Sequence, residues 1–357
     1  TIGNGMLALW AVAAAAAAHP RGANARGLSR ALLRPRAVST LRAGPPSLRG
    51  LAPLLDQYDA FLLDQFGVIH DGKQPYPGAV HALERLHQAG KKVVIISNSS
   101  RRRQDTLSRL EAMGFCAPLA AVTSGDLVWQ ALRSDETRPP FDGLGMRCFV
   151  FGNGEDDEEY VRSSGKVAAP VAQADFVLAR GLFSLLGAGP DLLTKPALPY
   201  TAEREEQLLK AALAKRPGGL PLLVANPDEV RPDGKDSPMP GQLARRYQAM
   251  GGRDIRFVGK PYPLIYEACK AILADAGLPA DARVAAVGDS LHHDVLGASR
   301  AGIDSVFVCG GVHHQALGVP QAQAVAPTPK RLTDLLDSFA EETGGVAPTH
   351  VVAGFTF

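Results

Sequence analysis

The chain has 357 residues, of which 46% are hydrophobic and 21% charged, as expected for a globular protein of about two domains. Its formal net charge of +2 comes from residues 1–55, which contain seven Arg and no Lys, Asp or Glu. The remainder has 31 basic and 36 acidic residues, a net charge of −5, so composition gives no case for nucleic acid as a partner. We expect no membrane span, because no stretch after these residues reaches about 18 uninterrupted apolar residues. The four scattered cysteines lack CxxC spacing and indicate reduced thiols, with a disulfide or a zinc site as the alternative.

Residues 1–55 have the composition of a targeting segment. They are rich in Ala and Arg, contain scattered Ser and Thr, and lack acidic residues, as organellar transit peptides do. Residues 7–18 also suit the apolar region of a secretory signal peptide, and a disordered cytosolic tail is the third interpretation. We expect import into a mitochondrion or plastid with removal of this segment, and a cytoplasmic protein as the alternative.

Repeated strand-helix units follow the first 55 residues. In chain order the patterns predict a strand at 60–63, a helix to about 89, a strand at 92–96, a helix at 103–113, a strand at 122–124 and a helix at 126–132. Gly90 and Gly114 end the first two helices, as glycines commonly do. Such repeats predict a parallel sheet with right-handed crossovers.

The pattern changes after residue 139. A Pro/Gly-rich linker spans 139–145. After it the sequence predicts strands at 147–151, 175–178 and 220–225 and a helix at 202–215. A second linker at 227–241 precedes helical patterns at 241–250 and 264–273 and a strand at 284–288. We therefore predict a discontinuous core domain at 56–139 and 227–342 with a smaller α/β domain inserted at 140–226. Residues 343–357 form a tail whose place the sequence leaves undecided.

Two apolar runs end abruptly in a carboxylate, at Asp64 and at Asp289. A buried strand that ends in Asp places a charge where open α/β sheets have their active sites. Asp294 follows Asp289 by five residues, and such a group of carboxylates is a natural site for Mg²⁺. Taken alone, Asp64 could equally be an ordinary turn residue.

Two further features suit a phosphate group. Ser97 and Asn98 follow a predicted strand and precede a helix, where hydroxyl, amide and backbone donors favour an anion, although a simple helix cap is the alternative. Lys260 is held between Gly259 and Pro261. A lone lysine is usually solvated, whereas one fixed in this way could neutralise both a phosphate and a nucleophilic carboxylate.

The ordered set resembles the haloacid dehalogenase-like (HAD) hydrolase superfamily over roughly residues 55–315. Ser97-Asn98, Asn226-Pro227-Asp228, Pro240-Gly241 and Gly259-Lys260-Pro261 are similar to its class IIA branch, the p-nitrophenyl phosphatase and NagD-like group. The resemblance implies an α/β fold, with a Rossmann-like three-layer core, a parallel sheet and an inserted α/β cap domain of the C2 type.

The resemblance also implies roles for individual residues. Asp64 would be the nucleophile that forms an aspartyl-phosphate, and Ser97 and Lys260 would bind the transferring phosphoryl group. The implied substrate-binding group also includes Asn98, Asn226 and Asp228, and the implied Mg²⁺ ligands are Asp64, the backbone carbonyl of Phe66, Asp289 and Asp294. The substrate would be a small phosphorylated metabolite, and the branch suggests a homo-oligomer.

Phe66 departs from the usual phosphatase pattern of the superfamily, which has a second Asp two residues after the nucleophile. That Asp protonates the leaving oxygen and later activates water, general acid–base work typically worth about 10²–10⁴-fold. His70, Asp71 or a cap side chain could replace it, or the leaving group could need no acid. A class IIA subgroup with an aromatic residue here is similar. We predict a weak or specialised phosphatase; the alternatives are other HAD chemistry such as dehalogenation and a non-catalytic protein that binds a phosphorylated ligand.

Overall fold

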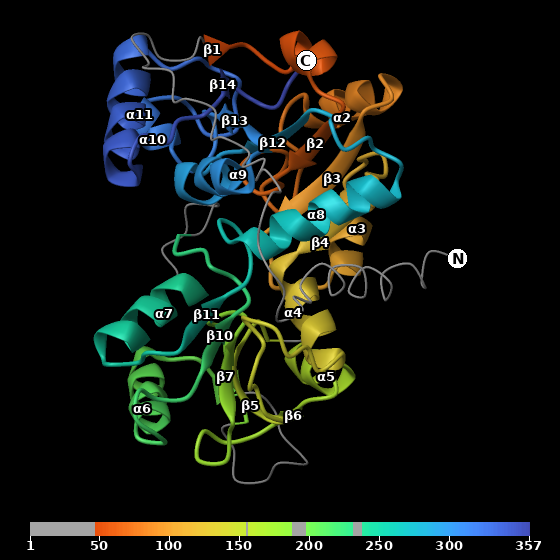
Figure 1. The fold of residues 1–357 in the computed structure, drawn as a ribbon. Coiled ribbons are helices and arrows are strands. Elements are labelled where there is room, and N and C mark those ends of the chain that lie inside the picture. The colour runs from red at the N-terminus through yellow and green to blue at the C-terminus, as the bar shows by residue number, and fades with distance from the viewer. Residues whose placement is uncertain (1–46, 155, 188–197, 231–237) are drawn as a thin grey trace, which may run out of the picture. The chain divides into compact units, whose positions relative to one another are not determined.

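The computed structural model describes residues 47–154, 156–187, 198–230 and 238–357, which contain two β-sheets (Figure 1). All strand pairs of the first sheet are parallel. Its order is β1 (Ser47–Leu48), β14 (His350–Val352), β13 (Asp304–Val308), β12 (Val284–Gly288), β2 (Ala60–Leu63), β3 (Lys92–Ser97) and β4 (Ala120–Thr123). The predicted parallel core sheet is therefore confirmed.

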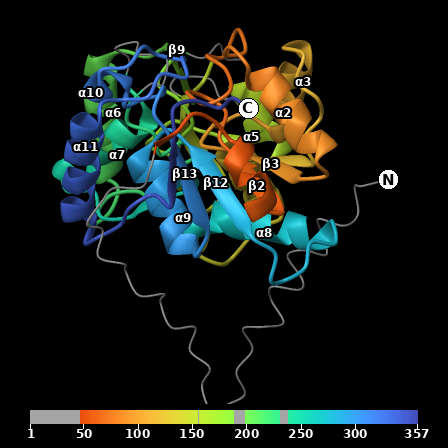
Figure 2. The ribbon, with the colours of Figure 1, turned by 90° about the horizontal axis from the view of Figure 1, so that it is seen from above.

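Helices cover both faces of this core sheet, as Figure 2 shows for α8 and α9 on one side and α2 and α3 on the other. The helices are α2 (Ala79–Gln88), α3 (Arg103–Ala112), α4 (Ser124–Arg133), α8 (Pro263–Asp275), α9 (Leu296–Ala301), α10 (His314–Leu317) and α11 (Pro329–Thr343), with a 3₁₀ helix at Ala52–Gln57 and a π-helix at Leu291–Val295. Side chains alternate between faces along each strand: Leu62 packs in the cluster with α4 and α8, whereas Phe61 and Leu63 pack with α2. This is the predicted three-layer, Rossmann-like α/β fold.

The second sheet is mixed. Its order is β11 (Ile255–Phe257), β10 (Leu222–Val224), β7 (Phe176–Ala179), β5 (Arg147–Gly152), β8 (Ser184–Leu186) and β9 (Leu198–Pro199), with β6 (Val167–Ala168) also on β5; its helices are α5 (Asp157–Ser163), α6 (Ala202–Leu213) and α7 (Pro240–Ala249). The strands from β11 to β5 pair in parallel, whereas β8 pairs antiparallel with both of its neighbours, β5 and β9. Phe151 and Val224 pack against α6 and α7 in a separate hydrophobic cluster.

The predicted end of the inserted domain at residue 226 is too early. β11 pairs with β10 in parallel, with Leu222 opposite Ile255. Leu243 and Tyr247 of α7 belong to the hydrophobic cluster of the second sheet. The Pro/Gly-rich segment 227–241 therefore connects two parts of the second sheet, and α7 and β11 belong to that sheet rather than to the core.

Both ends of the described chain pack on the core sheet. Leu51 and Leu54 are fully buried, and β1 pairs with β14, which lies in the segment predicted as a tail. Residues 47–55 are thus part of the folded core, contrary to the predicted leader boundary at 55, because their leucines fill the face that α2 covers. The rest of the predicted targeting segment lies outside the described residues. In the described part of the chain, no helix is long and apolar enough to cross a membrane.

Candidate active site

Three predicted carboxylates meet at the carboxyl ends of the core strands. Asp64 follows β2, Asp289 follows β12, and Asp294 lies in the π-helix Leu291–Val295. Each offers one oxygen atom to a group whose members all lie within 4.8 Å of one another. All three side chains are buried. The structure therefore brings together residues that are up to 230 positions apart in the sequence.

Backbone groups hold Asp289 tightly in place. The N–H of Val312 donates to Asp289 Oδ2 at 2.7 Å. A Cβ atom on Gly67 would lie 1.9 Å from the same oxygen, and one on Gly311 would lie 2.0 Å from it. Gly67 also has a φ of +79°, which glycine tolerates best. Gly67 therefore lies close against the Asp289 carboxylate, and the neighbouring Phe66 carbonyl stays a predicted metal ligand.

Lys260 is the cation of this cluster. Its Nζ lies 2.8 Å from Asp64 Oδ1 and 2.6 Å from Asp294 Oδ1. Burial acts to lower the pKa of Lys260, but the charges of Asp294 and Asp64 outweigh it and raise that pKa. Burial is also the main cause that raises the pKa of Asp64 to about 7, against the opposing effect of Lys260.

The cluster has the charge and donor set of a divalent-cation site. Burial, with repulsion from Asp64 and Asp294, raises the pKa of Asp289 well above its usual range. Three carboxylates face a single ammonium group, so the fully ionised cluster has two uncompensated negative charges. Carboxylate oxygens are the preferred ligands of hard cations, and a bound cation reverses these pKa shifts. The residues present therefore fit a divalent metal.

Asn98 holds the Lys260 backbone in position. Its Oδ1 accepts from Lys260 N at 2.6 Å, while its Nδ2 donates to Lys260 O at 3.1 Å and to Asp228 Oδ1 at 2.8 Å. Asp228 N in turn donates to Asn226 Oδ1 at 3.0 Å. Gly259, at a φ of +129°, leaves room for Asn98 Oδ1, which would lie 2.5 Å from a Cβ there. Asn98, with Asp228 and Asn226 behind it, thus supports the lysine loop. Their predicted part in substrate binding stays a prediction.

Ser97 ends β3 next to the carboxylates, with its hydroxyl held from within the protein. Its Oγ accepts from Gln65 Nε2 at 2.7 Å and from Ser99 N at 3.2 Å. Sequence reasoning did not single out Gln65. Its signal was a polar amide directly after Asp64, at a position that is only 3% exposed in the structure.

Among the described residues near Phe66, the two candidate acids of the same loop, His70 and Asp71, both make local hydrogen bonds. The Phe66 ring packs edge-to-face on His70, with centroids 4.8 Å apart. His70 Nδ1 accepts from Gly72 N at 3.0 Å, and burial lowers the pKa of His70 to about 4. Asp71 Oδ1 accepts from the backbone N–H groups of Lys73 and Gln74. The side chains of both candidate acids therefore bind backbone groups of their own loop, and the geometry supports neither in the role of the missing Asp.

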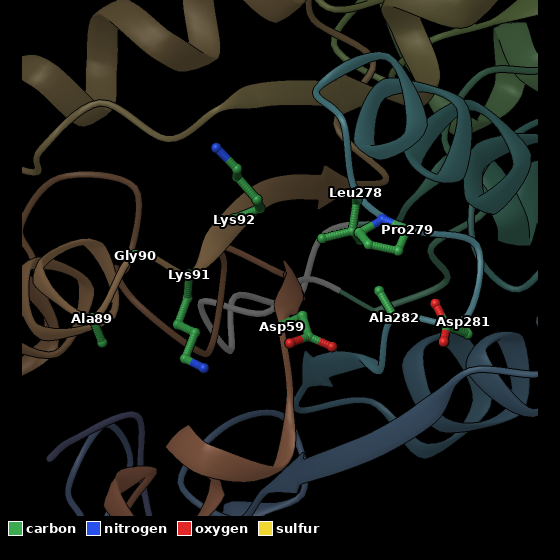
Figure 3. A pocket seen from close by; sticks show the side chains of 9 residues that line it. All are labelled: Asp59, Ala89, Gly90, Lys91, Lys92, Leu278, Pro279, Asp281 and Ala282. Carbon is green, nitrogen blue, oxygen red and sulfur yellow. The ribbon is translucent and has the colours of Figure 1, made fainter.

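A cavity of about 350 Å³ lies elsewhere on the core (Figure 3). Its lining includes Asp59, which precedes β2, and Lys92, which begins β3. These are the amino ends of the strands, whereas Asp64 follows the carboxyl end of β2. The cavity is therefore separate from the carboxylate cluster.

Family models match the two parts of the chain that form this site. A model described as haloacid dehalogenase-like hydrolase matches residues 61–166, and one described as HAD-hydrolase-like matches residues 257–341. The chain belongs to the HAD-like hydrolases, and it is an enzyme of that type.

Named relatives place the chain in the class IIA branch. Rattus norvegicus chronophin is 30% identical over 315 residues, covering 84% of this chain and 94% of the relative. The 4-nitrophenylphosphatase of Schizosaccharomyces pombe is 27% identical, covering 72% and 86%. A crystal structure of a haloacid dehalogenase-like hydrolase from Brucella suis is similar, with a TM-score of 0.64 and 26% identity, and covers 87% of this chain and all of that chain. The expected family is thereby confirmed.

Proposed function

We propose that this protein is a Mg²⁺-dependent hydrolase of small phosphate esters that acts through an aspartyl-phosphate on Asp64. The observation that carries the proposal is the contact of Lys260 Nζ with Asp64, 2.8 Å apart, inside a buried group of three carboxylates. Relatives named as phosphatases, among them a glycerol-3-phosphate phosphatase of Homo sapiens at 27% identity, support the same reaction class. We further propose that the enzyme is weak or specialised, because Phe66 cannot act as an acid.

In the first step, Asp64 attacks phosphorus, and the bond from phosphorus to the leaving oxygen breaks as the bond to the carboxylate forms. Lys260 and Ser97 lie where they can offset the charge on the phosphoryl oxygens. Asp64, Asp289, Asp294 and the Phe66 carbonyl would hold Mg²⁺, which would supply further positive charge at those oxygens. In the second step, the oxygen of a water molecule bonds to phosphorus as the bond to Asp64 breaks; the water protons leave on the inorganic phosphate or pass to solvent, and the Asp64 carboxylate is restored.

The absence of an acid beside Phe66 restricts the leaving group. His70 and Asp71 are occupied by local hydrogen bonds, so the leaving oxygen departs with its negative charge. This is easiest for phenols and other weakly basic alcohols. We therefore propose that good substrates have a leaving group of low pKa, which an aryl phosphate represents.

The test is Mg²⁺-dependent release of 4-nitrophenol from 4-nitrophenyl phosphate by the full chain and by Asp64→Asn. We expect turnover that needs Mg²⁺ and falls to background in Asp64→Asn. Asp71→Asn is the matched control, because it changes an exposed carboxylate of the same loop and preserves the turn. Turnover that survives in Asp64→Asn would contradict the proposal. Orthophosphate binding without turnover would favour the non-catalytic alternative, and Mg²⁺-independent halide release would favour dehalogenation.

Two predictions from the sequence stay proposals of their own. We propose that the acid-free, Arg-rich residues 1–46 direct import into an organelle. A fusion of these residues to a fluorescent protein should enter mitochondria or plastids, and diffuse cytoplasmic fluorescence would contradict this. We also propose a homo-oligomer, which sedimentation velocity of the full chain would reveal and a monomer at all concentrations would exclude.

A further inference from the structure

A chain of buried hydrogen bonds ends on the Ser97 hydroxyl. It begins at the backbone N–H of Gly72, which donates to His70 Nδ1 at 3.0 Å. His70 Nε2 lies 3.3 Å from Gln65 Oε1, and Gln65 Nε2 lies 2.7 Å from Ser97 Oγ. His70, Gln65 and Ser97 are each at most 3% exposed, so water competes little for these bonds.

This chain has one direction. A backbone N–H can only donate, so His70 Nδ1 accepts and the neutral ring has its proton on Nε2. That proton is donated to Gln65 Oε1, and the amide group of Gln65 then faces Ser97 with its NH₂. The polarity is thus set by a backbone group that cannot reverse it.

Because of this direction, the Ser97 hydroxyl can act toward a ligand only as a hydrogen-bond donor. Its Oγ accepts from Gln65 Nε2 and also from Ser99 N at 3.2 Å. A hydroxyl has two acceptor lone pairs and one proton. Both lone pairs are engaged, and among the described residues no acceptor for the Ser97 proton is found, so this proton can be donated to a ligand at the carboxyl end of β3.

We propose that Gln65 is a positioning residue that fixes the Ser97 hydroxyl as a donor to a phosphoryl oxygen of the substrate. The inference rests on the proposed function, because it assigns the direction of one hydrogen bond within that site. Without Gln65 the hydroxyl would rotate to suit any nearby acceptor. A donor that is oriented before the substrate arrives needs no reorganisation during the reaction.

A double-mutant cycle tests this role on 4-nitrophenyl phosphate. Gln65→Met keeps the length of the side chain and removes the amide. We expect it to lower kcat/KM about tenfold, the worth of one ordinary hydrogen bond, and Ser97→Ala to lower it by about 10²–10³-fold. In the Ser97→Ala background, Gln65→Met should have less than about a twofold effect, because no hydroxyl remains to be oriented.

An equal loss in both backgrounds would overturn the inference, because it would show that Gln65 acts on the fold rather than through Ser97. Gln130→Leu is the matched control. It removes a half-buried amide of α4, which is bonded to Asp126 away from the carboxylates, and should leave kcat/KM unchanged. If Gln65→Met does not fold, His70→Phe interrupts the same chain one bond earlier and replaces it in the cycle.

A binding measurement separates this inference from the proposed reaction. Orthophosphate with Mg²⁺ should raise the melting temperature of the wild-type protein, and Gln65→Met and Ser97→Ala should each reduce that rise, even if Asp64→Asn shows that turnover follows another route. An equal rise in wild type and Gln65→Met, or no rise in wild type, would overturn the role of Gln65. Asp64→Asn alone decides the aspartyl-phosphate route.

Discussion

Replacement of Lys260 by Met tests the electrostatic balance of the carboxylate cluster most directly. Lys260 is only 2% exposed and contacts Asp64 and Asp294 at 2.8 and 2.6 Å. Each contact is worth about 6 kcal/mol at an effective dielectric constant of about 20, but burial of the ammonium costs several kcal/mol in return. Removal of one partner from a buried ion pair typically costs about 3–5 kcal/mol net, and we expect a loss in this range for Lys260→Met.

Thermal unfolding in EDTA measures this loss. At roughly 2 °C per kcal/mol for a chain of this size, Lys260→Met should melt about 6–10 °C below wild type. Added Mg²⁺ should recover part of the difference, because the variant has one more uncompensated negative charge for the cation to bind. A ligand at 100 times its dissociation constant stabilises by about 2.7 kcal/mol.

Lys166→Met is the matched control. The Lys166 side chain is 4% exposed and lies 2.6 Å from Asp135, but Asp135 is 76% exposed. Water can therefore solvate the carboxylate left behind, and we expect a loss of only about 1 kcal/mol with no special recovery by Mg²⁺. The reasoning would be refuted if the two variants lost equal stability, or if Lys260→Met had the same melting temperature as wild type in EDTA.

Three further changes test other parts of the site. Burial raises the pKa of Asp64 to about 7, so protons compete with the cation below that pH; stabilisation by Mg²⁺ in thermal melts should be larger at pH 8 than at pH 6, and a pH-independent shift would contradict this. Burial lowers the pKa of His70 from 6.5 to about 4. The buried neutral ring therefore costs no stability above pH 6.5, but the free energy of unfolding decreases by up to about 3 kcal/mol as the pH falls from 6.5 toward 4. Denaturant titrations should show that the free energy of unfolding decreases less between pH 7 and pH 4.5 in His70→Gln than in wild type. An equal decrease in both proteins would exclude His70 as the source of this pH dependence. Phe66→Asp should raise kcat/KM on an alkyl phosphate at least about tenfold and change kcat/KM on 4-nitrophenyl phosphate little, whereas equal effects on kcat/KM for both substrates would mean that the new carboxylate does not act as an acid on the leaving oxygen.

The central strands of the core were predictable from the sequence because they are buried on both faces. β2 and β3 have near-continuous apolar runs, which is the pattern of parallel strands covered by helices. β11 was not predicted as a strand, and its residues were placed within the core domain, for a physical reason. Its three residues are only half-buried, and nothing local distinguishes a short strand that joins the second sheet from one that joins the core.

The residues of the site also divide into those that the sequence could predict and those that it could not. Asp64 and Asp289 were predicted because each directly follows an apolar strand, and parallel strands end at one edge of a sheet. The roles of Gln65 and Asn98 depend on bonds to Ser97 and Lys260, 32 and 162 positions away. Such pairings are set by the packing of side chains in the folded protein, which a local pattern of residue types does not encode.

The substitution at Phe66 divides the site by task. The groups proposed to act on phosphorus lie together: Asp64 and Lys260 are in contact, Asn98 is bonded to the lysine loop, and Gln65 is bonded to Ser97. The position that would act on the leaving oxygen instead has a ring packed on His70. On the proposed mechanism, the enzyme would lower the barrier to attack on phosphorus, while the barrier to departure of the leaving oxygen would depend on the substrate. Its rate should therefore fall steeply as the pKa of the leaving group rises, and a series of substituted phenyl phosphates would measure that slope directly.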